Sequence, residues 1–296
     1  MKKEDIRQSI SLIGPSSVGK SLISAELSNK TQMPVICIDD LLLMIDYEKN
    51  GKLNKSKDVQ KLFAKKCIEE LRGDPNFEVV LRNPTLRKRE IKLLNDMLKL
   101  YNFYLKLFGS LKPFYKILDR YQERERWAVL PAETIMNLNI VTTEIILKIF
   151  QFVDQPVIFD LPASFGWFAT DECSLETLNI GNLKKFGNVD FSEIKIFMES
   201  FLNTTQTVVL CPGEDYEKRN AARDSLENKL LIKYMQNYFD NAKIAITTNA
   251  VFYNPENKFL QRRSWLDAEE SLVKDKLKNK GEIANICDEI LSRIND

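Results

Sequence analysis

Five short apolar runs bounded by turn residues form the clearest pattern along the chain. They cover residues 10–13, 35–38, 157–159, 207–210 and 244–247, with a weaker sixth run at 79–81. Helical patterns separate them, at 21–29, 131–152, 193–201, 215–239 and 282–294. Buried parallel strands are short and apolar throughout. Their alternation with helices predicts an α/β fold of three layers, with a mainly parallel five-stranded sheet covered on both faces.

The connection between the second and third strands is far longer than the others. Connections in compact domains usually contain only a few residues, whereas this one is rich in Lys, Leu and aromatic residues with helical spacing. We therefore expect a core formed by residues 1–50 and 151–296. Residues 51–150 are expected to form a mainly helical insertion or lid subdomain.

A glycine-rich loop follows the first strand. Residues 14–21 read GPSSVGKS and match GxxxxGK[ST] in full, with a strand before and a helix after. In such a loop the backbone N–H groups and the helix N-terminus surround phosphate oxygens. Lys20 reaches the β- and γ-phosphates, and the Ser21 hydroxyl ligates Mg²⁺. The predicted nucleotide-binding residues are Gly14, Pro15, Ser16, Ser17, Val18, Gly19, Lys20, Ser21 and Leu22.

This motif is specific for a chain of this composition. Only 10 of the 296 residues are glycine, so chance produces the pattern in roughly one such chain in a few hundred. The motif predicts a phosphate-binding loop (P-loop, Walker A) that takes ATP or another nucleoside triphosphate with Mg²⁺.

Acidic residues stand at the ends of two predicted strands. Asp39 and Asp40 follow the run at 35–38, and Asp160 follows the run at 157–159. Carboxyl ends of parallel strands face the ligand crevice. We predict Asp39 as catalytic base and metal ligand, Asp160 as metal ligand, and Asp40 as a substrate-binding residue. The alternatives are a helix cap for Asp39 or Asp40 and an ordinary turn residue for Asp160.

Two arginines on the helix predicted after the fourth strand are further candidates. Arg219 and Arg223 lie four positions apart and so share one helix face. Beside the γ-phosphate, arginines neutralise developing charge, and we predict both, together with Lys20, as catalytic residues. The alternative is surface pairing with Asp215 or Glu227, which contributes little stability.

The order of loop, helix, strand and aspartate in residues 1–45 resembles several families of P-loop transferases. It is similar to shikimate kinase-like enzymes, and the 14–21 loop resembles those of chloramphenicol phosphotransferases and tRNA isopentenyltransferases. These families place an aspartate where Asp39 stands, as catalytic base or substrate ligand. The arginines after the fourth strand, the fifth strand and the last helix resemble the shikimate kinase layout.

Two parts of the shikimate kinase pattern are missing. Asp160-Leu161-Pro162-Ala163 replaces the glycine-rich turn expected after the third strand, and the lid region has no Arg-Pro pair. The resemblance therefore covers the core only. It implies an ATP-dependent kinase of a small hydroxylated molecule, without support for shikimate as the substrate.

Composition limits the other possibilities. The chain has no histidine, which excludes His-dependent triads and HExxH zinc chemistry. Its five cysteines are scattered, as expected in a reducing compartment. The N-terminus has no signal-peptide pattern and no apolar stretch is long enough to span a membrane, so we expect a cytoplasmic protein. The net charge of +1 indicates no polyanionic partner for the chain as a whole.

Residues 82–126 keep one alternative open. Lys and Arg outnumber Asp and Glu in this stretch, and aromatic residues are interleaved with them. Such a surface binds RNA or a phosphorylated substrate, although aromatic residues at this spacing are more often the core of a helical hairpin. The rival hypotheses are a nucleic-acid-directed P-loop enzyme, similar to tRNA isopentenyltransferases or polynucleotide kinases, and a nucleotide-binding regulatory protein with little turnover.

Overall fold

The computed structural model describes residues 9–15, 18–51, 98–126, 128, 131–162, 165, 191–213, 242, 244–248 and 281–295. Its strands are β1 (Ile10–Ile13), β2 (Val35–Cys37), β3 (Ile158–Asp160), β4 (Gln206–Pro212) and β5 (Ile244–Thr248). Its helices are α2 (Lys20–Thr31), α3 (Ile38–Lys49), the 3₁₀ turn η1 (Lys112–Phe114), α7 (Tyr115–Glu125), α8 (Pro131–Ile149) and α10 (Phe191–Thr204). Residues 98–108 and 281–295 are also helical.

All five strands pair in parallel, in the order β2-β3-β1-β4-β5. Register pairs Cys37 with Asp160 on β2 and β3, and Pro212 with Thr248 on β4 and β5. The carboxyl ends of the strands therefore lie at one edge of the sheet. This arrangement confirms the predicted α/β class with a five-stranded parallel sheet.

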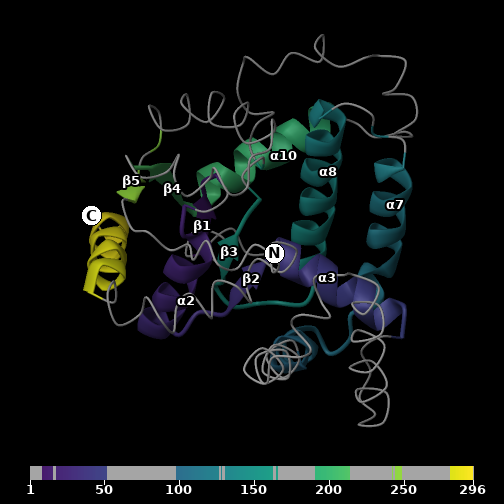
Figure 1. Ribbon diagram of the computed structural model, residues 1–296, viewed down its shortest axis with the longest axis horizontal. Coiled ribbons are helices and arrows are strands. Elements are labelled where there is room, and N and C mark those ends of the chain that lie inside the picture. Colours follow the sequence, from purple (N-terminus) through teal and green to yellow (C-terminus); the bar gives the residue numbers. More distant parts are fainter. Residues whose placement is uncertain are drawn as a thin grey trace, which may run out of the picture. The chain divides into compact units, whose positions relative to one another are not determined.

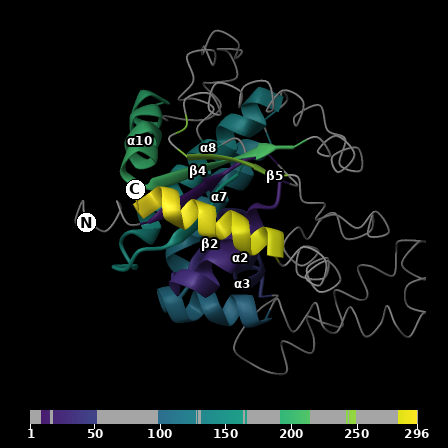
Figure 2. The ribbon, with the colours of Figure 1, turned by 90° about the vertical axis from the view of Figure 1, so that its left-hand side faces the viewer.

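One face of the sheet is covered by α2 and the helix 281–295. Alternate strand residues such as Ile10, Leu12 and Val208 point to this face, because successive side chains in a strand point to opposite sides. Leu27 of α2 and Ile286 of the last helix pack in the same core. Figures 1 and 2 show both helices on this side of the strands.

The opposite face packs against α10 and the end of α8. Phe159 of β3 lies 5.3 Å from Phe201 of α10 and 5.9 Å from Phe150, between ring centroids. Ser11 also points to this face and donates a hydrogen bond of 2.8 Å to Thr205 Oγ1, so its buried hydroxyl is paired. Figure 1 shows α10 and α8 on this side of the strands, which completes three layers.

Contacts divide the chain into two compact units, residues 1–40 with 119–296 and residues 41–118. The sequence placed the insertion at 51–150, whereas the structure assigns residues 119–150 to the unit with the sheet. The physical reason is the packing of α8 on α10 and of the adjoining Phe150 on the sheet.

Aromatic residues form the interior of the unit 41–118. Tyr104 stacks on Phe108, and Phe108 meets Phe114 edge to face. Glu48 accepts hydrogen bonds from Tyr101 at 2.6 Å and from Tyr115 at 2.9 Å. In the described part of residues 82–126, these aromatic side chains therefore pack as the core of a group of helices. This is the arrangement that the sequence offered as the alternative to a surface for base stacking.

Element boundaries differ from the sequence prediction by up to three residues, for example at the ends of β2 and α8. The strand predicted at 35–38 ends at Cys37, and α3 begins at Ile38 with no intervening loop. Asp39 and Asp40 thus occupy the first turn of α3, not a strand end or a cap before Leu41. The helix predicted to reach residue 152 ends at Ile149. The predicted strand at 79–81 and helix at 215–239 lie outside the described residues.

Among the described helices, none is long and apolar enough to cross a membrane.

Candidate functional site

The candidate residues of the unit 1–40 with 119–296 gather at the carboxyl edge of the sheet. The 14–21 loop continues β1, and Asp39 and Asp40 follow β2. Asp160 is the last residue of β3, next to β1 in the sheet. Ligands of open α/β sheets bind at this edge, so the topology brings together residues that are far apart in the chain.

Two glycines give the loop its conformation. A Cβ atom on Gly14 would lie 2.8 Å from the carbonyl oxygen of Leu210 and 2.8 Å from Val18 Cγ1, so only glycine fits beside β4. Gly19 has φ 98°, in the left-handed region that glycine adopts at low cost. Gly19 also caps α2, and its carbonyl accepts hydrogen bonds from the amides of Leu22 and Ile23.

The Lys20 ammonium group bonds to the stem of its own loop. Its Nζ donates to the carbonyl oxygen of Gly14 at 2.7 Å and of Pro15 at 3.3 Å. These acceptors are neutral backbone carbonyls at the start of the 14–21 loop. The Lys20 ammonium group therefore lies beside the backbone carbonyls of its own loop.

Ser21 and Asp160 form a direct pair. Ser21 Oγ donates a hydrogen bond of 2.9 Å to Asp160 Oδ2. Burial raises the pKa of Asp160 to about 6, although Lys20 and the hydrogen bond from Ser21 lower it. A hydroxyl and a carboxylate at one point offer two oxygen ligands of the kind that Mg²⁺ prefers.

The two aspartates at the start of α3 have different environments. The Asp39 side chain is exposed, whereas Asp40 is only 6% exposed. Desolvation by the surrounding protein raises the pKa of Asp39, and the charge of Lys20 opposes this shift. Burial raises the pKa of Asp40 well above its usual value, and the charges of Asp160 and Asp39 raise it further. Asp39 is the carboxylate that a ligand from solvent can reach.

The phenol of Tyr121 of α7 is close enough to Asp39 for the charge of that carboxylate to act on it. Burial raises the pKa of its phenol to about 12, and the carboxylates of Glu125 and Asp39 add to the shift. The backbone of this helix turn is fixed by Asn137 of α8, which donates to Tyr121 O at 3.1 Å and to Glu125 Oε1 at 2.6 Å. Arg124 Nε donates to Asn137 Oδ1 at 2.6 Å.

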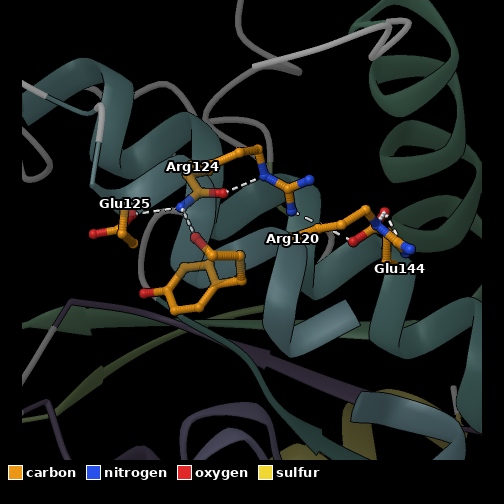
Figure 3. Close-up of polar contacts among 6 residues, drawn as sticks. Arg120, Arg124, Glu125 and Glu144 are labelled. Carbon is orange, nitrogen blue, oxygen red and sulfur yellow. Dashed lines mark hydrogen bonds and ion pairs between the residues drawn. The ribbon is translucent and has the colours of Figure 1, made fainter. Parts of the chain in front are cut away.

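The positive charge of Arg124 is shared inside this network. Its Nη2 lies 3.4 Å from Glu144 Oε2, and Arg120 binds Glu144 Oε1 at 2.9 Å. Burial lowers the pKa of Arg124, while Glu144 raises it. Figure 3 shows both arginines directed to Glu144, with Glu125 on the other side of Arg124. The network therefore joins α7 to α8 with its charges paired.

Several predicted site residues have other roles or lie outside the described part of the chain. The side chains of Val18 and Leu22 are buried in the core and leave only their backbone to the loop. Ser16, Ser17, Arg219 and Arg223 lie outside the described residues. Within the described ranges, no group of three or more Cys, Asp or Glu residues is arranged to hold a metal ion.

Two further residues, Thr248 at this edge and Tyr121, on which the charge of Asp39 acts, were not predicted from the sequence. Thr248 at the end of β5 is fully buried and donates a hydrogen bond of 2.9 Å to the carbonyl oxygen of Val18 in the loop. Tyr121 was counted only among the aromatic residues of the basic stretch. For Thr248 the available signal was its position after an apolar strand, where ligand-edge residues occur.

Comparison of the chain with protein-family models, curated proteins and solved structures finds no significant match.

Proposed function

We propose that the protein binds Mg-ATP at the 14–21 loop and transfers the γ-phosphoryl group to a hydroxyl of a small molecule. The observation that carries the proposal is the Ser21–Asp160 hydrogen bond of 2.9 Å. It joins the loop hydroxyl to a strand-end carboxylate, the two protein groups that hold Mg²⁺ in nucleotide-binding loops of this type.

The loop supplies the phosphate contacts. Its amides and the N-terminus of α2 present N–H donors to phosphate oxygens. Lys20 would exchange the carbonyls of Gly14 and Pro15 for the β- and γ-phosphates. This exchange replaces neutral acceptors by charged ones, which form stronger hydrogen bonds with an ammonium group.

The residues present fit a Mg²⁺ ion that is brought by the nucleotide. Mg²⁺ usually keeps several waters and takes one or two carboxylates together with substrate phosphates. Ser21 and Asp160 would supply the protein ligands, and bound Mg²⁺ would neutralise charge on the phosphates. Asp39 remains free for the acceptor.

Asp39 is proposed as the general base. Its exposed carboxylate lies close enough to Lys20 for the two charges to interact. A raised pKa brings a carboxylate closer to the operating pH, which favours proton transfer. Asp39 takes the proton of the acceptor hydroxyl, the oxygen forms a bond to the γ-phosphorus, and the bond from that phosphorus to the ADP oxygen breaks.

The charges on the acceptor side support a neutral hydroxylated acceptor. The carboxylates of Asp39 and Glu125 both raise the pKa of the Tyr121 phenol. The neighbouring Arg124 is paired with Glu144. The carboxylates of Asp39 and Glu125 would repel an anionic acceptor there. The buried aromatic residues of the unit 41–118 give no support to the nucleic-acid-directed alternative.

The test is a screen for Mg-ATP binding by calorimetry, followed by phosphate transfer to a panel of hydroxylated compounds. The panel contains glycerol, ribose and myo-inositol as neutral probes and glycerate as an anionic probe. The expected result is micromolar to millimolar Mg-ATP binding and transfer to a neutral probe. Absence of Mg-nucleotide binding by the wild-type protein would overturn the proposal.

A further inference from the structure

The carbonyl of Val18 is directed out of the loop to the end of β5. Thr248 Oγ1 donates to this oxygen at 2.9 Å, and both residues are fully buried. A trans peptide is planar, and its C=O and N–H point to opposite sides. The amide N–H of Gly19 therefore points away from Thr248, to the side on which the loop would hold phosphate.

The orientation of this peptide is easily lost at a glycine. Gly19 has φ 98°, and glycine adopts positive and negative φ values at similar cost. A rotated 18–19 peptide would turn the Val18 carbonyl toward the phosphates and remove one N–H donor from them. Anion-binding loops depend on backbone N–H groups that point at the anion. A group that fixes the orientation of the 18–19 peptide therefore affects the affinity of the loop for phosphate.

We infer that Thr248 is a positioning residue that locks the 18–19 peptide in its phosphate-binding orientation. This inference rests on the proposed binding of a nucleotide by the loop. The hydroxyl acts through the peptide and does not itself touch the ligand. It removes the freedom that Gly19 introduces into the loop.

Thr248 is itself well anchored for this role. Its hydroxyl also lies 3.4 Å from the carbonyl oxygen of Cys211, and its own carbonyl accepts a hydrogen bond of 3.0 Å from Gly213 N. The adjoining strand β4 contacts the loop as well, because Leu210 O leaves no room for a Cβ on Gly14. The ends of β4 and β5 therefore both contact the backbone of the loop.

Three variants test the lock. Thr248→Val removes the donor and keeps the branched shape, whereas Thr248→Ser keeps the hydroxyl. Thr205→Val is the matched control, because Thr205 is a buried threonine whose hydroxyl donates to Phe201 O at 3.1 Å and accepts from Ser11. Thr205 precedes β4, at the opposite edge of the sheet from the loop.

Calorimetry with Mg-ATP and urea unfolding are measured on all three variants. We expect Thr248→Val to weaken Mg-ATP affinity about tenfold, which corresponds to about 1.4 kcal/mol. Thr248→Ser is expected to stay within about twofold of wild type, and so is Thr205→Val despite its loss of stability. Wild-type affinity in Thr248→Val, or an equal loss in Thr205→Val, would overturn the inference.

A crystal structure of nucleotide-free Thr248→Val separates this inference from the proposed function. The lock requires the Val18 carbonyl to leave its wild-type direction or to occupy two directions. An unchanged 18–19 peptide in that variant would overturn the inference, whether or not the wild-type protein binds nucleotide. Absence of nucleotide binding by the wild-type protein counts instead against the proposed function.

Discussion

Ser21 Oγ donates a hydrogen bond of 2.9 Å to Asp160 Oδ2, although the two residues are 139 positions apart in the chain. The contact exists because β3 pairs directly with β1, which places its last residue beside the start of α2. Lys20, the neighbour of Ser21, bonds to the loop carbonyls of Gly14 and Pro15. The hydroxyl and ammonium groups of the loop thus lie at the same edge of the sheet as the Asp160 carboxylate.

Lys20→Ala is expected to weaken Mg-ATP affinity at least about tenfold or to abolish transfer, because the phosphates lose their fixed counter-charge. Calorimetry and an ADP-release assay measure the two effects. Lys30→Ala is the matched control on the same helix, since Lys30 pairs with Asp288 away from the loop. Equal affinity and rate in Lys20→Ala and wild type would contradict the assignment.

Asp39→Asn is expected to lower the transfer rate by about 100-fold or more, the usual scale for loss of a general base, with Mg-ATP affinity within a few-fold. Asp46→Asn, two turns later on α3, serves as the control and should transfer at the wild-type rate. The comparison uses steady-state rates with a saturating acceptor. A loss of Mg-ATP binding in Asp39→Asn would assign Asp39 to the metal instead.

The pKa of Asp160, about 6 in the folded protein, predicts opposite pH effects on stability and on metal binding. An aspartate in an unfolded chain has a pKa of about 4. Because the folded-state pKa is raised, the stabilisation from Asp160 is complete below about pH 4 and is lost as pH rises through about 6. The full shift corresponds to about 3 kcal/mol.

Urea unfolding of metal-free wild type and Asp160→Asn at pH 4 and pH 7 measures this contribution. Asp39 and Asp40 also have raised pKa values, and the charge of Asp160 contributes to that of Asp40, so the difference between the two proteins reports Asp160 together with its effect on Asp40. We expect the variant to gain stability relative to wild type at pH 7. Wild-type affinity for Mg-ATP should rise through about pH 6, because Mg²⁺ binds the carboxylate. If the difference in free energy of unfolding between the two proteins is the same at both pH values, the raised pKa of Asp160 is refuted.

Gly14→Ala is expected to destabilise the fold by about 1–3 kcal/mol, because the added Cβ meets backbone that cannot move aside. Gly281→Ala is the control, since nothing lies within 4 Å of its Cβ position at the start of the last helix. That change should leave stability equal or raise it by up to about 1 kcal/mol. Thermal unfolding of both variants measures their stabilities. A similar loss of stability in the two would show that the structure accommodates a Cβ atom at Gly14.

Much of this site was predictable because its signals are local. The 14–21 motif identified Gly14, Lys20 and Ser21, and the rule that strand ends face the ligand edge identified Asp160. The apolar runs located all five described strands. β1 and β3 are buried at every position, and such strands leave an apolar signal in the sequence.

The rest depended on contacts with no local signal. The partner of Val18 is Thr248, 230 positions away, and threonine at a strand end has many ordinary explanations. The start of α3 at Ile38 was missed because an apolar residue followed by two aspartates continues a strand as readily as it opens a helix. The packing of α8 on α10, and of the adjoining Phe150 on β3, had no local signal because both partners follow α8 in the chain.

Asn137 and Asn139 of α8 allow a matched test of the network that joins α7 to α8. Both side chains are fully buried on the same helix. Asn137 bonds to three residues of α7, whereas Asn139 donates only to Ile135 O at 3.0 Å and its Oδ1 has no partner among the described residues. Truncation of each to alanine changes volume and helix propensity equally. Any difference in stability therefore reports the contacts to α7.

Asn137→Ala is expected to lower the free energy of unfolding by about 2–4 kcal/mol, because Arg124 Nε and Glu125 lose a buried partner. Asn139→Ala should change it by less than about 1 kcal/mol, since loss of a local bond is offset by removal of an unpaired oxygen. Urea unfolding at pH 7 measures both. If the two variants lose equal stability, the hydrogen bonds of Asn137 contribute nothing beyond packing, and α7 is held on α8 by apolar contacts alone.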